Sequence, residues 1–222
     1  MRYLIIITVL LLLFFAALAF GPGLAGENIG KAIPKATFDE SGMSGTQTAV
    51  LAGGCFWGLQ GAFSHVKGVS EVISGYSGGE KSTATYDQVT TETTGHAEAV
   101  KISYDPKQVS YGTLLRIFFS VVHDPTQLDR QGPDVGNSYR SEIFAVTPEQ
   151  ERIANAYTEQ LSKARVFDAP IVTRIERLKG FYAAEDYHQN YLVNHPTQPY
   201  IVRYDLPKIQ ALKKVYPGLY RE

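Results

Sequence analysis

The chain contains a single cysteine, and its neighbours place it where a thiol could react. Residues 48–52 form an apolar run typical of a buried strand, which a pair of glycines ends. Apolar residues then recur at helical spacing from Phe56 to Val66, so Cys55 is expected in the first turn of a helix. The free N–H groups there favour the thiolate, and a pKa lowered from ~8.5 to ~7 would make about half of the thiol nucleophilic. The alternative is that Cys55 is unreactive and packs in the core as a small hydrophobic residue.

Two aromatic residues follow the cysteine, and one of them, Trp57, is the only tryptophan in the chain. Adjacent residues of a helix point in different directions, so Phe56 could join the core while Trp57 points elsewhere. Two aromatic rings beside a thiol could form a small apolar pocket. Plain packing in the core is the alternative interpretation of the same pair.

A carboxyl group shares one face of a strand predicted at residues 98–104 with apolar side chains. Glu98 alternates in step with Val100, Ile102 and Tyr104. If that face is buried, the carboxylate is poorly solvated and its pKa rises, to about 6. A carboxyl held protonated near neutral pH can donate a proton to an oxygen that gains charge. The alternative is that Glu98 begins the strand and stays solvated.

Three further polar residues are candidates for the same chemistry. Tyr86 in a loop and Tyr139 at the start of a strand would supply neutral hydroxyl donors, and Asp134 lies in the glycine-punctuated loop at residues 131–138. Loop residues often carry function. Because the chain has 14 tyrosines, periodicity alone does not select these two.

The five histidines raise two other possibilities, a metal site and a Cys-His hydrolase. His188 and His195 are seven residues apart and could share a helix face, but no carboxylate stands at an obvious ligand spacing. The spacing argues equally against a Cys-His pair. We therefore expect His96, His123 and His188 to serve packing or hydrogen bonding.

Hydrophobic periodicity and capping residues predict the elements that position these groups. Strands are expected at residues 48–52, 69–76, 98–104, 139–146 and 171–178, and helices at 56–66, 111–122, 148–163, 183–195 and 207–215. Ser110 and Thr147 are expected to cap helices, with Gln150 bonding back to Thr147. Up to residue 146 the order is strand, helix, strand, strand, helix, strand. This order indicates an α+β fold, a ferredoxin-like two-layer α/β sandwich with extra C-terminal helices and loops.

The first 26 residues are typical of a targeting segment. An apolar run at residues 3–20 follows Arg2 and precedes a Gly/Pro-rich stretch. Small residues allow signal cleavage before Phe20 or Gly26, while the length of the run also allows it to remain as a membrane anchor. In both cases the folded part is exported, to the periplasm or another extracytoplasmic space. Residues 27–45 are expected to be a linker, and residues 46–222 the catalytic domain.

Composition and charge fit a globular domain that acts on a small group or a peptide. The chain is 44% hydrophobic and 19% charged, with a net charge of -1 and no block of like charges. The sequence therefore offers no electrostatic case for binding nucleic acid. An exported chain with one cysteine cannot form an internal disulfide, so Cys55 is either inert or chemically active.

Three motifs in order closely resemble the A-type peptide methionine sulfoxide reductases. They are GCFWG at residues 54–58, GHAEAV at 95–100 and QGPDVGNSYRS at 131–141. The resemblance extends through YSGG at 76–79, Tyr86, HDP at 123–125 and AEDYHQ at 184–189, and covers about residues 46–203. It implies reduction of methionine S-sulfoxide, protein-bound or free, as repair after oxidative damage.

The resemblance also implies a role for each candidate residue. Cys55 would attack the sulfoxide sulfur and become a sulfenic acid, while Phe56 and Trp57 would bind the S-methyl group. Glu98 would protonate the sulfoxide oxygen, Tyr86 and Tyr139 would stabilise it, and Asp134 would help to fix the site. Neutral donors in a dry pocket suit an oxygen that gains charge as sulfur is attacked. No metal or organic cofactor is implied.

The sequence departs from many family members because it lacks a second, resolving cysteine near the C-terminus. The Cys55 sulfenic acid would therefore need an external thiol, from a thioredoxin-like protein or a small molecule. The alternative class is a non-catalytic module that binds oxidised methionine or senses oxidants through Cys55. Both classes need the pocket, and only the enzyme needs Glu98.

Overall fold

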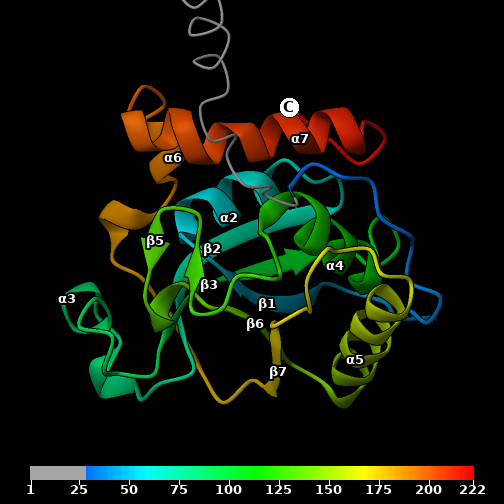
Figure 1. Ribbon diagram of the computed structural model, residues 1–222, viewed down its shortest axis with the longest axis horizontal. Helices are drawn as coiled ribbons and strands as arrows, with labels where there is room; N and C mark the ends of the chain where they lie inside the picture. Colours follow the sequence, from blue (N-terminus) through cyan, green and yellow to red (C-terminus); the bar gives the residue numbers. More distant parts are fainter. Residues whose placement is uncertain (1–28) are drawn as a thin grey trace, which may run out of the picture.

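The computed structural model describes residues 29–222 and is built on a six-stranded sheet with the strand order β7-β6-β1-β3-β2-β8 (Figure 1). The strands are β1 Gln47–Gly53, β2 Val69–Ser77, β3 Ala97–Tyr104, β6 Ser141–Ala145, β7 Arg174–Arg177 and β8 Phe181–Ala183. The four central strands, β6-β1-β3-β2, pair antiparallel throughout, while β7 adds to β6 in parallel. This is the ferredoxin-like order expected from the sequence, so that prediction is confirmed.

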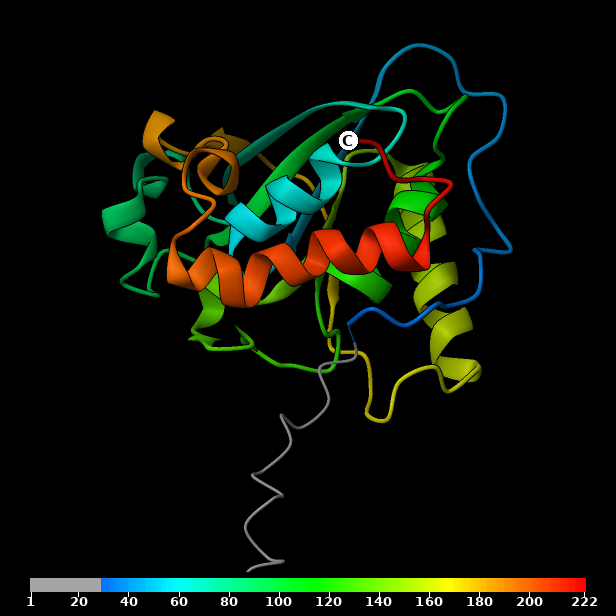
Figure 2. The ribbon, with the colours of Figure 1, turned by 90° about the horizontal axis from the view of Figure 1, so that it is seen from above.

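Helices occupy the connections between the strands and the C-terminal part of the chain. They are α2 Phe56–Ser64, α3 Tyr86–Val89, α4 Tyr111–Ile117, α5 Pro148–Lys163, α6 Tyr191–Asn194 and α7 Leu206–Val215. Shorter turns are η1 Lys81–Thr83, η2 Phe118–Val122, η3 Asn137–Tyr139, η4 Asp186–His188 and η5 Ile201–Asp205. A separate two-stranded ribbon is formed by β4 Arg130–Gln131 and β5 Asp134–Val135. In Figures 1 and 2, α2 lies against the sheet and α7 lies against α2.

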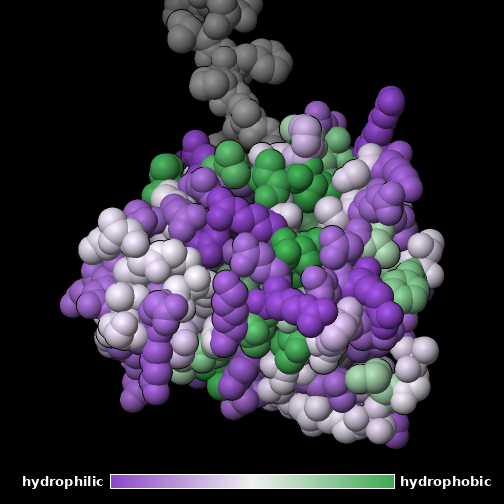
Figure 3. All heavy atoms as spheres, turned by 90° about the horizontal axis from the view of Figure 1, so that it is seen from below, coloured by the Kyte–Doolittle hydropathy of each residue, from purple (hydrophilic) through white to green (hydrophobic). Residues whose placement is uncertain are grey.

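The two faces of the sheet carry two separate apolar clusters. Along β1, Ala49 and Leu51 join the main core with the helices, whereas Val50 and Ala52 join a small cluster on the other face with Phe144. This division follows from the period of two along a strand. The face of the molecule in Figure 3 carries small groups of hydrophobic residues separated by hydrophilic ones. The main core is therefore the layer between the sheet and the helices.

The helix starts are largely as the sequence predicts. Ser110 Oγ accepts from the Thr113 N–H, and Thr147 Oγ1 accepts from the Gln150 N–H at 3.2 Å. One detail is wrong: the Gln150 side chain accepts from the Val146 N–H at 3.0 Å, one residue before the cap. The apolar stripe that begins in α4 continues as the wider turn η2 and ends at residue 122, as expected before the proline.

The predicted helix at residues 183–195 is wrong. Its place is taken by the end of β8, the turn η4 and the single-turn helix α6. Tertiary hydrogen bonds override helical propensity here: the Gln189 side chain accepts from the Ser74 N–H at 3.0 Å, and the Ala184 N–H donates to the Ser74 oxygen at 2.9 Å. Asn190, with φ of 54°, then reverses the chain in a left-handed conformation.

Two predicted strands are shorter than expected. The strand predicted at residues 171–178 is reduced to β7, because the Val172 N–H donates to the Pro125 oxygen at 2.8 Å and not to the sheet. The strand predicted from Tyr139 starts at Ser141, because the Glu92 carboxylate accepts from the Ser138 N–H and hydroxyl at 2.7 Å and holds the preceding residues in the turn η3.

The segment expected to be a linker is packed onto the domain from residue 29 on. It forms no helix or strand, but Ile33 is buried, and the Tyr157 hydroxyl donates to the Pro34 oxygen at 2.6 Å. The Asp39 and Glu40 side chains accept backbone N–H groups at the start of α4. These contacts satisfy groups that a helix start leaves unpaired, so the segment is part of the folded unit.

The predicted targeting segment, residues 1–26, lies outside the described residues. Within residues 29–222, no helix combines the length and hydropathy needed to cross a membrane.

Candidate active site

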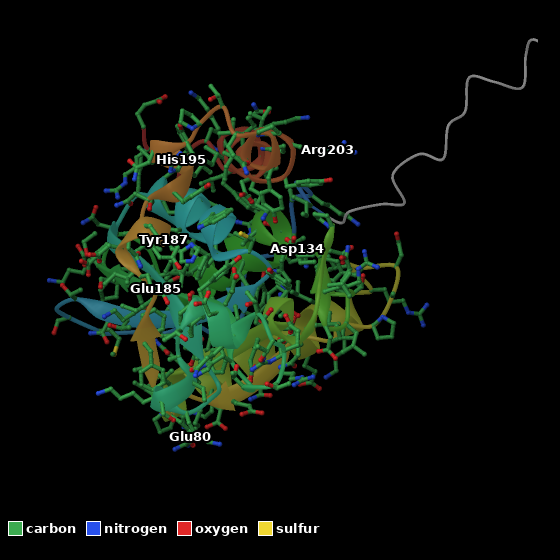
Figure 4. All side chains as sticks on the ribbon, turned by 90° about the vertical axis from the view of Figure 1, so that its left-hand side faces the viewer. Glu80, Asp134, Glu185, Tyr187, His195 and Arg203 are labelled. Carbon is green, nitrogen blue, oxygen red and sulfur yellow. The ribbon has the colours of Figure 1, made fainter. Side chains whose placement is uncertain are left out.

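All seven residues that the sequence predicts for the reactive site line one cavity of about 150 Å³. The lining residues are Cys55, Phe56, Trp57, Tyr86, Glu98, Asp134, Tyr139 and Tyr200. The start of α2 contributes three of them, β3 contributes Glu98, and the remaining side chains come from α3, β5, η3 and the residue before η5. Figure 4 faces this side of the molecule, with Asp134 on one flank and Glu185 and Tyr187 on the other. The candidates come from distant parts of the chain, so the fold alone brings them together.

Cys55 occupies the N-cap position of α2, one residue before the helix begins, and does not lie inside the first turn as expected. It is buried, with a relative exposure of 7%. Burial, followed by the negative charges of Glu98 and Asp205, raises the pKa of the thiol well above its ordinary value, although the Trp57 N–H and Lys208 lower it. The predicted low pKa is therefore wrong, because desolvation outweighs the helix terminus. At neutral pH Cys55 is therefore a thiol.

Glycines flank the cysteine where other parts of the chain approach closely. Gly54 has φ of 94°, and a Cβ there would lie 2.6 Å from Gln131 Cγ. A Cβ on Gly58 would lie 2.1 Å from Asp205 Oδ1. Both distances are too short for any side chain, so the glycines allow the loop at residues 131–138 and the end of η5 to close around the thiol.

Glu98 is the buried acid that the strand pattern predicts. It is 2% exposed, and its Oε2 accepts from the Phe56 N–H at 2.9 Å. Burial raises its pKa to about 8, against the opposing effect of that hydrogen bond. The direction of the prediction is confirmed, and a solvated carboxylate at the strand start is ruled out. Because Oε2 already accepts an N–H, Oε1 is the oxygen suited to hold the proton.

Tyr86 and Tyr139 both present phenols that stay protonated. Burial and the nearby Glu98 raise the pKa of Tyr86 to about 12, and the same two causes raise the pKa of Tyr139 further. The Glu185 carboxylate fixes the start of α3, because its Oε1 accepts from the Tyr86 N–H at 2.9 Å. The cavity therefore contains hydroxyl donors that remain neutral over the physiological pH range.

Tyr200 is the cavity residue that sequence reasoning missed. Its hydroxyl donates a short hydrogen bond to Asp134 Oδ2. Burial raises the pKa of Asp134, and this hydrogen bond opposes the rise. Among 14 tyrosines, no spacing marks Tyr200, because the contact joins residues 66 positions apart.

The aromatic pair after the cysteine both packs with the main core and lines the cavity. Phe56 is 1% exposed and belongs to the main core, yet it also lines the cavity. Trp57 stacks on Tyr191 with ring centroids 3.7 Å apart, and its Nε1–H donates to His188 Nδ1 at 3.2 Å. Burial lowers the pKa of His188, so its ring is neutral and accepts this bond through Nδ1. The indole is thus fixed in position.

Histidines do not supply the chemistry of this cavity. The eight lining residues include none. His123 is buried, burial lowers its pKa to about 4, and its Nδ1 lies 2.9 Å from the Phe118 oxygen. Among the described residues, no three His, Cys, Asp or Glu side chains are grouped to hold a metal. The reactive set is therefore one thiol, one carboxylic acid and several phenols beside aromatic rings.

Such a set defines a thiol-dependent enzyme for a small substrate with one polar and one apolar end. The family model described as peptide methionine sulfoxide reductase matches residues 47–217. The chain is 57% identical to MsrA 2 of Mesorhizobium japonicum, over 83% of this chain and 94% of that protein. It is 50% identical to MsrA 2 of Synechocystis sp., over 84% and 89% respectively.

Solved structures agree with these relatives. Reduced Mxr1 from Saccharomyces cerevisiae is 33% identical, with a TM-score of 0.62 over 73% of this chain and 92% of that one. Methionine sulfoxide reductase A of Corynebacterium diphtheriae is also 33% identical, with a TM-score of 0.60 over 79% and 88%. The chain belongs to the peptide methionine sulfoxide reductase family. It is an enzyme that reduces methionine sulfoxide, and the non-catalytic alternative is set aside.

Proposed function

We propose that Cys55 Sγ attacks the sulfur of methionine S-sulfoxide, protein-bound or free, inside the 150 Å³ cavity. One observation carries the proposal: a buried thiol, a carboxylic acid with a pKa of about 8 and two neutral phenols line the same small space. Glu98, Tyr86 and Tyr139 receive the sulfoxide oxygen. Phe56 and Trp57 provide the apolar wall for the S-methyl group.

The proposed step balances without any group from outside the site. The Cys55 sulfur gives two electrons and receives the oxygen, while the substrate sulfur accepts two electrons and leaves as the thioether. Glu98 donates its proton to the oxygen as the new S–S contact forms, and it recovers the proton of the Cys55 thiol. The products are methionine and a Cys55 sulfenic acid. Donors fixed in a buried cavity stabilise the developing charge on oxygen without reorganising.

Asp134 acts in this proposal by positioning its neighbour. The Asp134–Tyr200 hydrogen bond joins the loop at residues 131–138 to the residue before η5, across the cavity. A link of this kind keeps both walls at a fixed separation and so supports the shape of the binding site.

Recycling of the enzyme is proposed to need an external thiol. Cys55 is the only cysteine in the chain, so no internal disulfide can form. A thiol RSH would convert the sulfenic acid to a mixed disulfide and water, and a second thiol would release Cys55 and a disulfide. A thioredoxin-like protein or a small thiol fits this role. The scheme requires no metal or organic cofactor.

Export is part of the proposal and rests on the sequence alone. The apolar run at residues 3–20 supports delivery to the periplasm or another extracytoplasmic space, with residues 1–26 either cleaved or kept as a membrane anchor. Mass spectrometry of the protein from its native host measures the mature N-terminus directly. A mass equal to that of the whole chain, found in the cytosol, would refute export.

The experiment that tests the reaction compares the two separated epimers of methionine sulfoxide with dithiothreitol as the reductant. We expect turnover of the S epimer alone, and no more than a single turnover when thiol is left out. Equal rates on both epimers would contradict a pocket that fixes the methyl and oxygen in different places. Continued turnover without thiol would contradict the recycling scheme.

A further inference from the structure

A buried ion pair lies beside the active-site helix, outside the group of residues that the reaction uses. Lys208 Nζ donates to Asp205 Oδ1 at 3.1 Å, and the two side chains are 8% and 0% exposed. Within residues 29–222, the other carboxylate oxygen, Oδ2, has no hydrogen-bond partner. Removing two charges from water is costly, and replacing such a pair by apolar residues is often neutral or stabilising. Folding stability alone therefore does not explain why this ion pair is present.

The side chains of the pair pack against the first turn of α2. A Cβ on Gly58 would lie 2.1 Å from Asp205 Oδ1 and 2.6 Å from Lys208 Nζ, so glycine makes the approach possible. Gly58 is three residues from Cys55. Lys208 and Cys55 also line one narrow recess, which shares Cys55, Asp134 and Tyr200 with the substrate cavity. The charges thus lie close to the reactive sulfur.

The surroundings of Cys55 contain many acidic groups and one base. Glu98 from β3, Asp134 from β5, Asp205 from η5 and the phenols of Tyr86, Tyr139, Tyr200 and Tyr204 line the cavity or recess or act on the thiol electrostatically. Lys208 is the only cation among the described residues that line either space. Burial is the main cause of the raised pKa of Cys55, Asp205 adds to it, and Lys208 opposes it.

We propose that the Asp205–Lys208 pair sets the charge of the Cys55 sulfur: Lys208 stabilises the thiolate, and Asp205 holds the ammonium in place while offsetting part of its effect. Both are positioning residues, since they act through Cys55. The idea rests on the proposed function only in taking Cys55 as the nucleophile. A buried carboxylate that is free to pair with just one lysine keeps that charge at a fixed distance from the sulfur.

Alkylation of the full-length protein by iodoacetamide tests the proposal. The chain has one cysteine, so the mass increase reports Cys55 alone. The rate is measured from pH 6 to pH 11 for the wild type, Lys208→Met and Asp205→Asn. The midpoint of the rate's increase with pH reports the pKa of the Cys55 thiol. We expect this midpoint to rise by about one pH unit in Lys208→Met and to fall in Asp205→Asn, since a nearby charge shifts a pKa by about this amount. Lys208→Arg should restore the wild-type midpoint.

Lys213 provides a matched control on the same helix. It pairs with Glu222 at 2.9 Å and its side chain is 59% exposed, so Lys213→Met removes an equal charge from an exposed site on α7. Its midpoint should equal that of the wild type. A shift as large as that of Lys208→Met would mean that net charge, and not the buried pair, controls the thiol.

The proposal predicts midpoint shifts of opposite sign in Lys208→Met and Asp205→Asn, and a merely structural role of the pair does not. Loosened packing would expose Cys55 in both single variants and lower both midpoints, which would overturn the proposal. If a single variant does not fold by circular dichroism, the neutral double variant Asp205→Asn/Lys208→Met replaces it. Its midpoint should lie between the expected single values, and a value outside that interval would overturn the proposal. Alkylation is independent of sulfoxide turnover, so failure of the reductase assay leaves this result readable.

Discussion

Replacing Glu98 by glutamine should make the folding stability of the protein less dependent on pH. In the wild type the carboxyl titrates at about 8 when folded, against an ordinary value of 4.5. Below pH 4.5 the group is protonated in both states and adds no penalty. Between these values the unfolded chain releases a proton that the folded chain keeps, so stability falls as pH rises until the folded group ionises near pH 8.

The full titration of Glu98 lowers the free energy of unfolding by about 5 kcal/mol. About 4 kcal/mol of this loss falls between pH 5 and pH 8.5. Glutamine has no titration and its side-chain oxygen can still accept the Phe56 N–H. We therefore expect Glu98→Gln to resemble the wild type in stability near pH 5 and to exceed it by several kcal/mol at pH 8.5. Urea denaturation at the two pH values measures the difference, because the midpoint and slope give the free energy of unfolding.

Glu176→Gln provides the control, because it removes one exposed carboxyl from β7 and changes the charge of the unfolded chain equally. Its curve should run parallel to that of the wild type. The same Glu98→Gln protein should reduce sulfoxide about 100-fold more slowly, since general acid catalysis commonly contributes 100-fold or more. Parallel stability curves for the wild type and Glu98→Gln would refute the argument, because Glu98 would then ionise as in an unfolded chain and could not keep its proton at neutral pH.

Three other changes test separate parts of the site. Cys55→Ser should have no measurable reductase activity even with excess dithiothreitol, and any activity above background would contradict the nucleophile assignment. His188→Phe removes the acceptor of the indole N–H, so we expect KM to rise about fivefold with a smaller change in kcat. The fluorescence maximum of Trp57, the only tryptophan, should shift too, and an unchanged spectrum and KM would argue against this support. Tyr200→Phe should cost about 1–3 kcal/mol in urea denaturation by leaving Asp134 without its donor, and a change below about 0.5 kcal/mol would argue against that contact.

Much of the fold follows from the spacing of apolar residues that a single strand or helix requires. The strands β1, β2 and β3, the helices α2, α4 and α5, and two side-chain caps lie where alternation, helical spacing and capping residues predict them. The region from β8 to α6 does not, because contacts distant in sequence decide its form. Gln189 binds Ser74, which lies 115 residues away, and no local pattern indicates that bond.

The site shows the same limit in its electrostatics. The strand face predicted that the Glu98 carboxyl is buried, and hence the direction of its pKa. The helix start suggested a low pKa for Cys55, yet the thiol is surrounded by protein and lies near two acids, Glu98 and Asp205, that are remote in sequence. Burial can be inferred from alternation along one strand, whereas the charges around a side chain depend on the tertiary fold. Only the resemblance to the family indicates Tyr86, Tyr139 and Asp134, because no hydrophobic period marks them.

The raised pKa values of Cys55 and Glu98 are coupled in a way that suits the reaction. Burial disfavours charge on both groups, and a charged Glu98 further disfavours the thiolate of Cys55. The cavity without substrate is therefore most stable with both protons in place, which keeps the sulfur as a weakly reactive thiol. In the proposed mechanism a bound sulfoxide changes this balance, because its oxygen takes the proton of Glu98 as the sulfur atoms approach. The carboxylate left behind can then accept the thiol proton, so negative charge moves through the site without two anions being present together. In this mechanism, thiolate formation is a consequence of substrate binding and not a property of the free enzyme.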